Sequence, residues 1–244
     1  MQAVAKGSSK VLLSATLSVL LGVGVVAGVG YTLNKASDDG RAPVIATMAG
    51  NIDTPKGNMP HAIATLSVYA DAESSGGAHG PDGGSHPGYV TYGPSNDLVL
   101  PAHSLVTITI NGYDGGETLN TPFFGKVIGT VDGSMDVDGK KITSLGMTEV
   151  QHTFTIHSLP TSSQDPLFVN IPLSKQPDDA MEKFDADGTL PKPIVTTFSF
   201  YTGGVGEYVW NCEFPCGDGT YAKFGAAMSK YGYMSGKVSV VEHI

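Results

Sequence analysis

The stretch GEYVWNCEFPCGDG, residues 206–219, contains both cysteines and the one tryptophan of a 244-residue chain. Its first half alternates apolar and polar residues, which predicts a β-strand with Trp210 and Cys212 on one face. The chain must turn after this strand, because Pro215 lacks a backbone N–H and the glycines that follow allow a positive φ. We therefore expect Cys216 to fold back toward Cys212.

Two chemistries are open to this pair of cysteines. Residues four apart across a turn can reach the Cα separation of ~5.5–6 Å that a disulfide needs, and an oxidising compartment would close the bond. Thiolates are also the ligands that soft metal ions prefer. The spacing of the two cysteines leaves both outcomes open.

A second stretch, EVQHTFTIH at 149–157, predicts another strand. Alternation places His152 on the same face as Phe154 and Ile156, so its imidazole is expected to point inward. A buried neutral imidazole needs a partner. A metal ion on one ring nitrogen would satisfy it while the other nitrogen donates to a backbone carbonyl or to water, and a hydrogen bond within the core is the alternative.

Short alternating segments recur along the rest of the chain, whereas helix-favouring runs are scarce. This pattern is typical of an all-β sandwich or barrel of antiparallel strands. The segment DGSMDVDGKK at 132–141 is expected to form tight turns around a short strand, because Asp-Gly pairs favour hairpins. Besides the two strands above, we expect strands at 61–70, 96–112 with a break at Pro101, 194–202 and 236–242.

The N-terminal part carries an uncharged apolar run from Val11 to Tyr31, long enough to cross a bilayer as a helix of ~20 residues. A cleaved signal peptide is the alternative, because Lys6 and Lys10 precede the run, but the apolar core of such peptides is shorter, at ~7–15 residues. We expect a single-pass anchor in the cell membrane, with the C-terminal domain on the extracytoplasmic side. The expected division is a cytoplasmic N-terminus at 1–10, a transmembrane anchor at 11–33, a linker at 34–60 and a folded domain at 61–244.

The net charge and the absence of catalytic motifs restrict the possible functions. A formal net charge of −9 without clustered Lys or Arg argues against nucleic acid. The chain has no G-x-S-x-G, H-E-x-x-H or P-loop motif, which leaves hydrolytic and nucleotide-dependent activities without support. We expect the chain to have no catalytic activity of its own.

The C-terminal stretch GYMSGKVSVV at 232–241 completes a known pattern. An inward histidine, then a cysteine with a short Pro-containing loop, then G-x-M-x-G-x-V-x-V resembles the cupredoxin family of copper electron-transfer domains. The spacing of Cys212 and Cys216 instead resembles C-x-x-x-C-G-x-x-H-x-x-M, the signature of the CuA domain in subunit II of haem-copper oxidases. The resemblance covers about residues 96–244 and implies a Greek-key β sandwich or barrel.

The resemblance also implies a set of copper ligands. They are the bridging thiolates of Cys212 and Cys216, the imidazole of His152, the thioether of Met234 and, as a weak ligand, the backbone carbonyl of Phe214. The second imidazole of the CuA pattern would fall at Thr220, and no histidine lies between Cys216 and Met234. One copper ion or two are therefore expected.

The function implied by this resemblance is that of a membrane-anchored copper electron-transfer protein or a redox subunit of a respiratory membrane complex. Its partner would be a haem-copper oxidase or a small redox protein. Two alternatives stay open. A metal-free accessory subunit with a Cys212–Cys216 disulfide would account for the missing imidazole, and a copper carrier would use the same soft ligands for Cu(I).

Overall fold

The chain divides into two compact units, Met1–Asp39 and Gly40–Ile244. The computed structural model describes residues 5–36, 40–69, 89–114, 118, 122–160, 163–177, 179–180, 190, 192–217 and 225–244.

The first unit is a single helix, α1 (Ala5–Ala36). Between Leu13 and Leu33 it is long and apolar enough to cross a membrane, and all of its side chains in this range are exposed. An apolar helix without a buried face is what a lipid-facing span requires, because lipid solvates such side chains and water does not.

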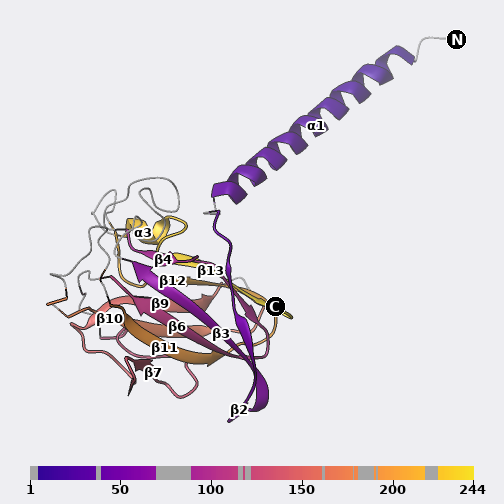
Figure 1. Ribbon diagram of the computed structural model, residues 1–244. Helices are drawn as coiled ribbons and strands as arrows, with labels where there is room; N and C mark the ends of the chain where they lie inside the picture. The colour runs from indigo at the N-terminus through magenta and orange to yellow at the C-terminus, as the bar shows by residue number, and fades with distance from the viewer. Residues whose placement is uncertain are drawn as a thin grey trace. The chain divides into compact units, whose positions relative to one another are not determined.

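The second unit is built from two β-sheets (Figure 1). The first sheet contains, in spatial order, β1 (Val44–Ile45), β5 (Leu98–Pro101), β13 (Ser235–Val241), β12 (Gly206–Asn211), β9 (Val150–Ser158) and β10 (Phe168–Ser174). The second contains β2 (Thr47–Thr54), β3 (Gly57–Tyr69), β6 (Leu105–Gly112), β11 (Ile194–Tyr201), β7 (Met135–Val137) and β8 (Lys140–Ile142), with β4 (Thr91–Gly93) paired to β3. A short helix, α3 (Ala226–Ser229), precedes β13.

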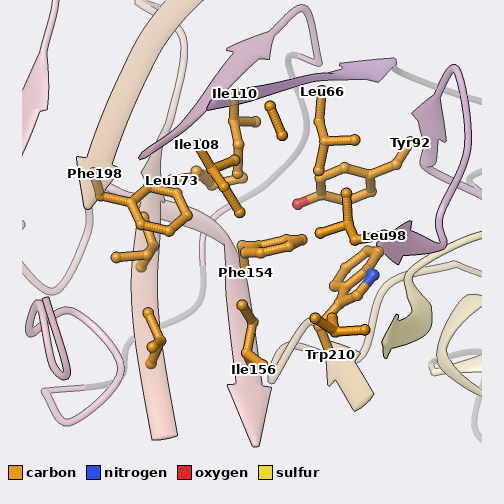
Figure 2. Close-up of a cluster of buried hydrophobic side chains, with 14 of the residues drawn as sticks. Leu66, Tyr92, Leu98, Ile108, Ile110, Phe154, Ile156, Leu173, Phe198 and Trp210 are labelled. Carbon is orange, nitrogen blue, oxygen red and sulfur yellow. The ribbon is translucent and has the colours of Figure 1, made fainter. Parts of the chain in front are cut away.

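The core lies between the two sheets (Figure 2). Leu66 and Ile110 come from one sheet and face Phe154 and Trp210 from the other. Strand β13 alternates buried with more accessible positions, because its sheet turns one face to the core, whereas β9 is buried throughout from Val150 to Ile156. The prediction of an all-β sandwich preceded by one apolar helix is confirmed.

The pairing of the strands differs from the antiparallel expectation. Strands β3 and β6 run parallel, as do β5 and β13, and β1 and β5. The sheets are therefore mixed, which strand alternation cannot reveal because it is the same in both kinds of sheet. The hairpin expected at 132–141 is confirmed as β7 and β8, with Asp138 and Gly139 both at positive φ in its turn.

The linker expected at 34–60 is wrong from residue 44 onward. Strands β1 and β2 and the start of β3 occupy this segment. Even Arg41 belongs to the domain, because its guanidinium donates to the carbonyl oxygens of Tyr92 and Gly232 at 2.7 and 2.8 Å. The sequence did not reveal these strands because β2 is an edge strand whose residues are almost all exposed, so that no apolar alternation marks it.

Candidate metal centre

Three of the predicted ligands meet at one end of the first sheet. The Nδ1 atom of His152 lies 3.1 Å from the Sγ atom of Cys216 and 3.9 Å from the Sγ atom of Cys212, and the two sulfur atoms are 3.7 Å apart. Among the residues that the structure describes, these three form the one group of His, Cys, Asp and Glu side chains close enough to share a metal ion. Cys212 is 2% exposed and His152 is 5% exposed, so the centre is buried.

Strand β9 presents His152 through an irregularity in its pairing. Leu173 pairs with His152, whereas Ser174 pairs with Val150, so Gln151 is an extra residue in β9. A β-bulge of this kind redirects the side chains around it. As a result, Gln151 and His152 reach the same acceptor atom, although strict alternation would place them on opposite faces. The prediction that His152 points inward is confirmed.

The loop after β12 turns as the sequence predicts. The N–H of Cys216 donates to the carbonyl oxygen of Phe214 at 2.8 Å, which closes a tight turn and brings the second thiol back. The sulfur of Cys212 accepts the backbone N–H groups of Thr153 and Phe214, both at 3.4 Å. These donors stabilise negative charge on the buried sulfur of Cys212.

Helix α3 connects the cysteine loop to the start of β13. Ala227 donates its N–H to the carbonyl oxygen of Cys216 at 3.2 Å and accepts the N–H of Met234 at 3.2 Å. Gly217 makes this approach possible: its φ is +77°, and a Cβ atom there would lie 2.9 Å from both the Cβ of Ala227 and a ring carbon of Tyr89. The backbone between the ligands is thus fixed at several points.

The two weaker predicted ligands lie next to the cluster. Met234 is fully buried, and its carbonyl oxygen accepts the N–H of Cys212 at 3.0 Å, which places the two residues side by side. The carbonyl of Phe214 accepts the N–H of Cys216, so one of its two lone pairs is already used. The roles of Met234 and of the Phe214 carbonyl as ligands remain predictions.

A buried carboxylate that no sequence motif marks completes the site. Asp114 lies just beyond β6. Its Oδ2 atom accepts hydrogen bonds from Nε2 of His152 at 2.5 Å and from the side-chain amide of Gln151 at 2.7 Å. We expected a backbone carbonyl or water as the partner of this ring nitrogen. The partner is instead a side chain that follows a strand of the second sheet. Asp114 and His152 lie 38 positions apart in the sequence, so no local motif joins them.

The three ionisable ligands polarise one another. Burial opposes the charge on His152, but its hydrogen bonds to Asp114 and to Cys212 outweigh this effect and raise its pKa to about 10. Burial likewise opposes charge on Cys212, yet the hydrogen bonds from Cys216 and His152 hold the pKa of this thiol well below its usual value. The hydrogen bond to Cys212, burial and the neighbouring charge on Cys212 raise the pKa of Cys216. The metal-free cluster thus favours one thiolate beside one imidazolium.

The donor set fits a soft metal ion. Both cysteines are free thiols. Two sulfur ligands at the usual zinc–sulfur length of ~2.3 Å around a tetrahedral ion would be ~3.8 Å apart, close to the 3.7 Å between the two sulfur atoms. His157 does not take part, because its ring bonds to Asn211 and to a backbone carbonyl. Position 220, where the second imidazole of the CuA pattern would fall, lies outside the described residues.

No protein-family model matches this chain, and no curated protein matches it. Solved structures of two cupredoxins, rusticyanin and auracyanin B, resemble it. The rusticyanin structures include a reduced form (16% identity over 74% of this chain and 84% of the other, TM-score 0.36) and rusticyanin from Thiobacillus ferrooxidans (15% over 74% and 82%, TM-score 0.32). Auracyanin B shows 11% identity over 82% and 99%, with a TM-score of 0.31.

Proposed function

We propose that this chain is a membrane-anchored copper protein that transfers single electrons. The observation that carries the proposal is a buried cluster of one imidazole nitrogen and two cysteine sulfur atoms, whose pairwise distances are 3.1 to 3.9 Å. His152, Cys212 and Cys216 would hold the copper, with Met234 and the Phe214 carbonyl beside them. One ion or two can be held by this set.

Copper is favoured over other metals by the chemistry of the donors. Thiolate and thioether ligands suit Cu(I), and imidazole suits Cu(II) and zinc, so a mixed set accommodates both oxidation states of copper. Bound copper would supply the one-electron couple. The chain would supply a rigid frame, because the ligands extend from strands of a packed sheet and their backbones are hydrogen-bonded to one another.

Burial of the site favours electron transfer over reaction with a bulky substrate. His152 and Cys212 are almost completely covered, and the rings two residues along the chain from each of them, Phe154 and Trp210, stack on one another with centres 4.6 Å apart. Exclusion of solvent from a site tunes the reduction potential of a bound metal. Only Cys216 is partly exposed. We place the route for electrons at this side of the site.

The apolar helix supports the membrane part of the proposal. Its length and its exposed apolar side chains suit a single span. We propose that the β domain lies on the extracytoplasmic side. Anchoring raises the effective concentration of the domain near membrane partners. A respiratory membrane complex such as a haem-copper oxidase, or a small redox protein, is the partner that we propose.

The alternatives are a metal-free accessory subunit and a copper carrier. The first is favoured by the closeness of the sulfur atoms, 3.7 Å apart, because a small rotation would allow them to bond. The carrier is less well supported, because a carrier must release its metal readily and Cys212 is buried.

Metal analysis with absorption and EPR spectroscopy tests these functions. The full chain in detergent would be purified under reducing conditions and titrated with Cu(I) or Cu(II). Intense thiolate-to-copper absorption would support electron transfer, and the hyperfine pattern would distinguish one copper nucleus from two that share an electron. A colourless protein that retains no copper and carries a Cys212–Cys216 disulfide by mass spectrometry would contradict the proposal.

A further inference from the structure

Asp114 is a carboxylate buried at the end of β6, with 5% of its surface exposed. Such groups are costly to bury unless hydrogen bonds satisfy them. One of its oxygen atoms, Oδ2, lies within hydrogen-bonding distance of both Gln151 and His152. Asp114 and Gln151 thus form a compact polar group with His152, one of the proposed ligands.

The hydrogen bond to Asp114 decides which nitrogen of His152 faces the sulfur atoms. An ionised carboxylate only accepts hydrogen bonds, so the Nε2 atom, 2.5 Å from Oδ2, must carry a proton. The other nitrogen, Nδ1, is the atom that lies 3.1 Å from Cys216. In the neutral imidazole that binds a metal ion, the proton on Nδ1 is gone, and a ring held in this way turns the Nδ1 lone pair toward the space between the two cysteines.

The bulge in β9 is what makes the arrangement possible. Because Gln151 is the extra residue of β9, it donates to the same oxygen atom that His152 contacts. Gln151 therefore holds Asp114 through a contact that involves neither the ring of His152 nor the metal. A group that is itself fixed can fix the ring it contacts.

We propose that Asp114, held by Gln151, is the positioning residue of the metal centre: it directs Nδ1 of His152 at the ion and places a negative charge beside it. This inference rests on the proposed function, because it assigns a role toward bound copper. Loss of such a partner typically weakens metal binding by ~10–100-fold. A nearby anion also favours the more positive oxidation state, so removal of the charge raises the reduction potential.

The first test needs no metal. In full-length protein labelled with ¹⁵N-histidine, we expect NMR to detect the Nε2–H of His152 as a downfield, slowly exchanging proton. In Asp114→Asn, which keeps the size of the side chain, this signal should shift upfield or vanish. Absence of a protected Nε2–H in the unsubstituted protein would overturn the orienting role.

The second test is a copper titration of the same variants. Asp114→Asn should bind copper ~10–100-fold more weakly and show a higher reduction potential, and Gln151→Met should shift both in the same direction by less. Asp132→Asn is the charge-matched control, because Asp132 pairs with Lys141 at the β7–β8 hairpin and should leave both values unchanged. Thermal unfolding identifies a variant that is merely destabilised.

The outcomes separate this inference from the proposed function. If the unsubstituted chain binds copper and Asp114→Asn binds it equally tightly with the same potential, the positioning role is wrong and the copper function stands. If the unsubstituted chain binds no copper, the copper function fails, and the charge effect assigned to Asp114 fails with it. The NMR signal then decides the orienting role by itself.

Discussion

The backbone N–H of Cys212 donates to the carbonyl oxygen of Met234 at 3.0 Å. This bond extends the ladder between β12 and β13 past its last pair, Asn211 and Ser235. Two proposed ligands that are far apart in sequence are thereby held on adjacent strands. A third, Cys216, is joined to Met234 through the backbone of Ala227.

Replacement of His152 tests the ligand set directly. His152→Ala removes the only imidazole nitrogen that faces the sulfur atoms within the described parts of the chain, so copper affinity should fall more than ~100-fold. Metal analysis and competition with a Cu(I) chelator measure the change. His157→Ala, on the same strand but bonded to Asn211, should retain copper. Equal copper content in both variants would remove His152 from the site.

Replacement of Gly217 tests whether the backbone places Cys216. Gly217→Ala combines a positive φ with a Cβ that would meet Ala227 and Tyr89 at 2.9 Å, so it should lower the free energy of unfolding by ~1–3 kcal/mol and weaken copper binding. Gly133→Ala is the control, because Gly133 has a φ of +69° and open space around it. Gly133→Ala should lower the stability without weakening copper binding. Denaturant unfolding and a parallel copper titration measure the two effects. The prediction fails if the two variants bind copper alike.

Removal of the polar group from two buried aromatic residues should have different effects on the stability of the protein. The hydroxyl of Tyr92 has no hydrogen-bond partner among the described residues, whereas Nε1 of Trp210 donates to the carbonyl oxygen of Asn96 at 2.6 Å. Tyr92→Phe should change stability by less than ~0.5 kcal/mol or increase it, and Trp210→Phe should cost ~1–3 kcal/mol. Denaturant unfolding of both variants provides the comparison. A large loss of stability in Tyr92→Phe would reveal a partner for its hydroxyl.

Acid should weaken the β7–β8 hairpin in a narrow range of pH. Hydrogen bonds from Lys141 and Ser134 lower the pKa of Asp132 from 3.8 to about 2. A lowered pKa in the folded state stabilises the protein above the ordinary pKa, and this contribution is lost as the pH falls through the folded value. The unfolding free energies of Asp132→Asn and the unsubstituted protein should therefore differ by a constant amount above about pH 5 and converge near pH 2. Because Asp132 is exposed, the difference should stay under ~1 kcal/mol. A difference that persists at pH 2 would contradict the assignment.

Local sequence patterns were enough to predict the strands with strong alternation, the apolar helix and the inward placement of His152 and Cys212, because each follows from a local period or a local turn. It could not determine the strands at 44–54, whose residues are exposed at an edge, or the mixed pairing of the sheets. Asp114 meets His152 only in the folded domain, because the contact joins a residue just beyond β6 to a β-bulge in a strand of the other sheet. Contacts of this kind depend on register and packing, which no local pattern of residues records.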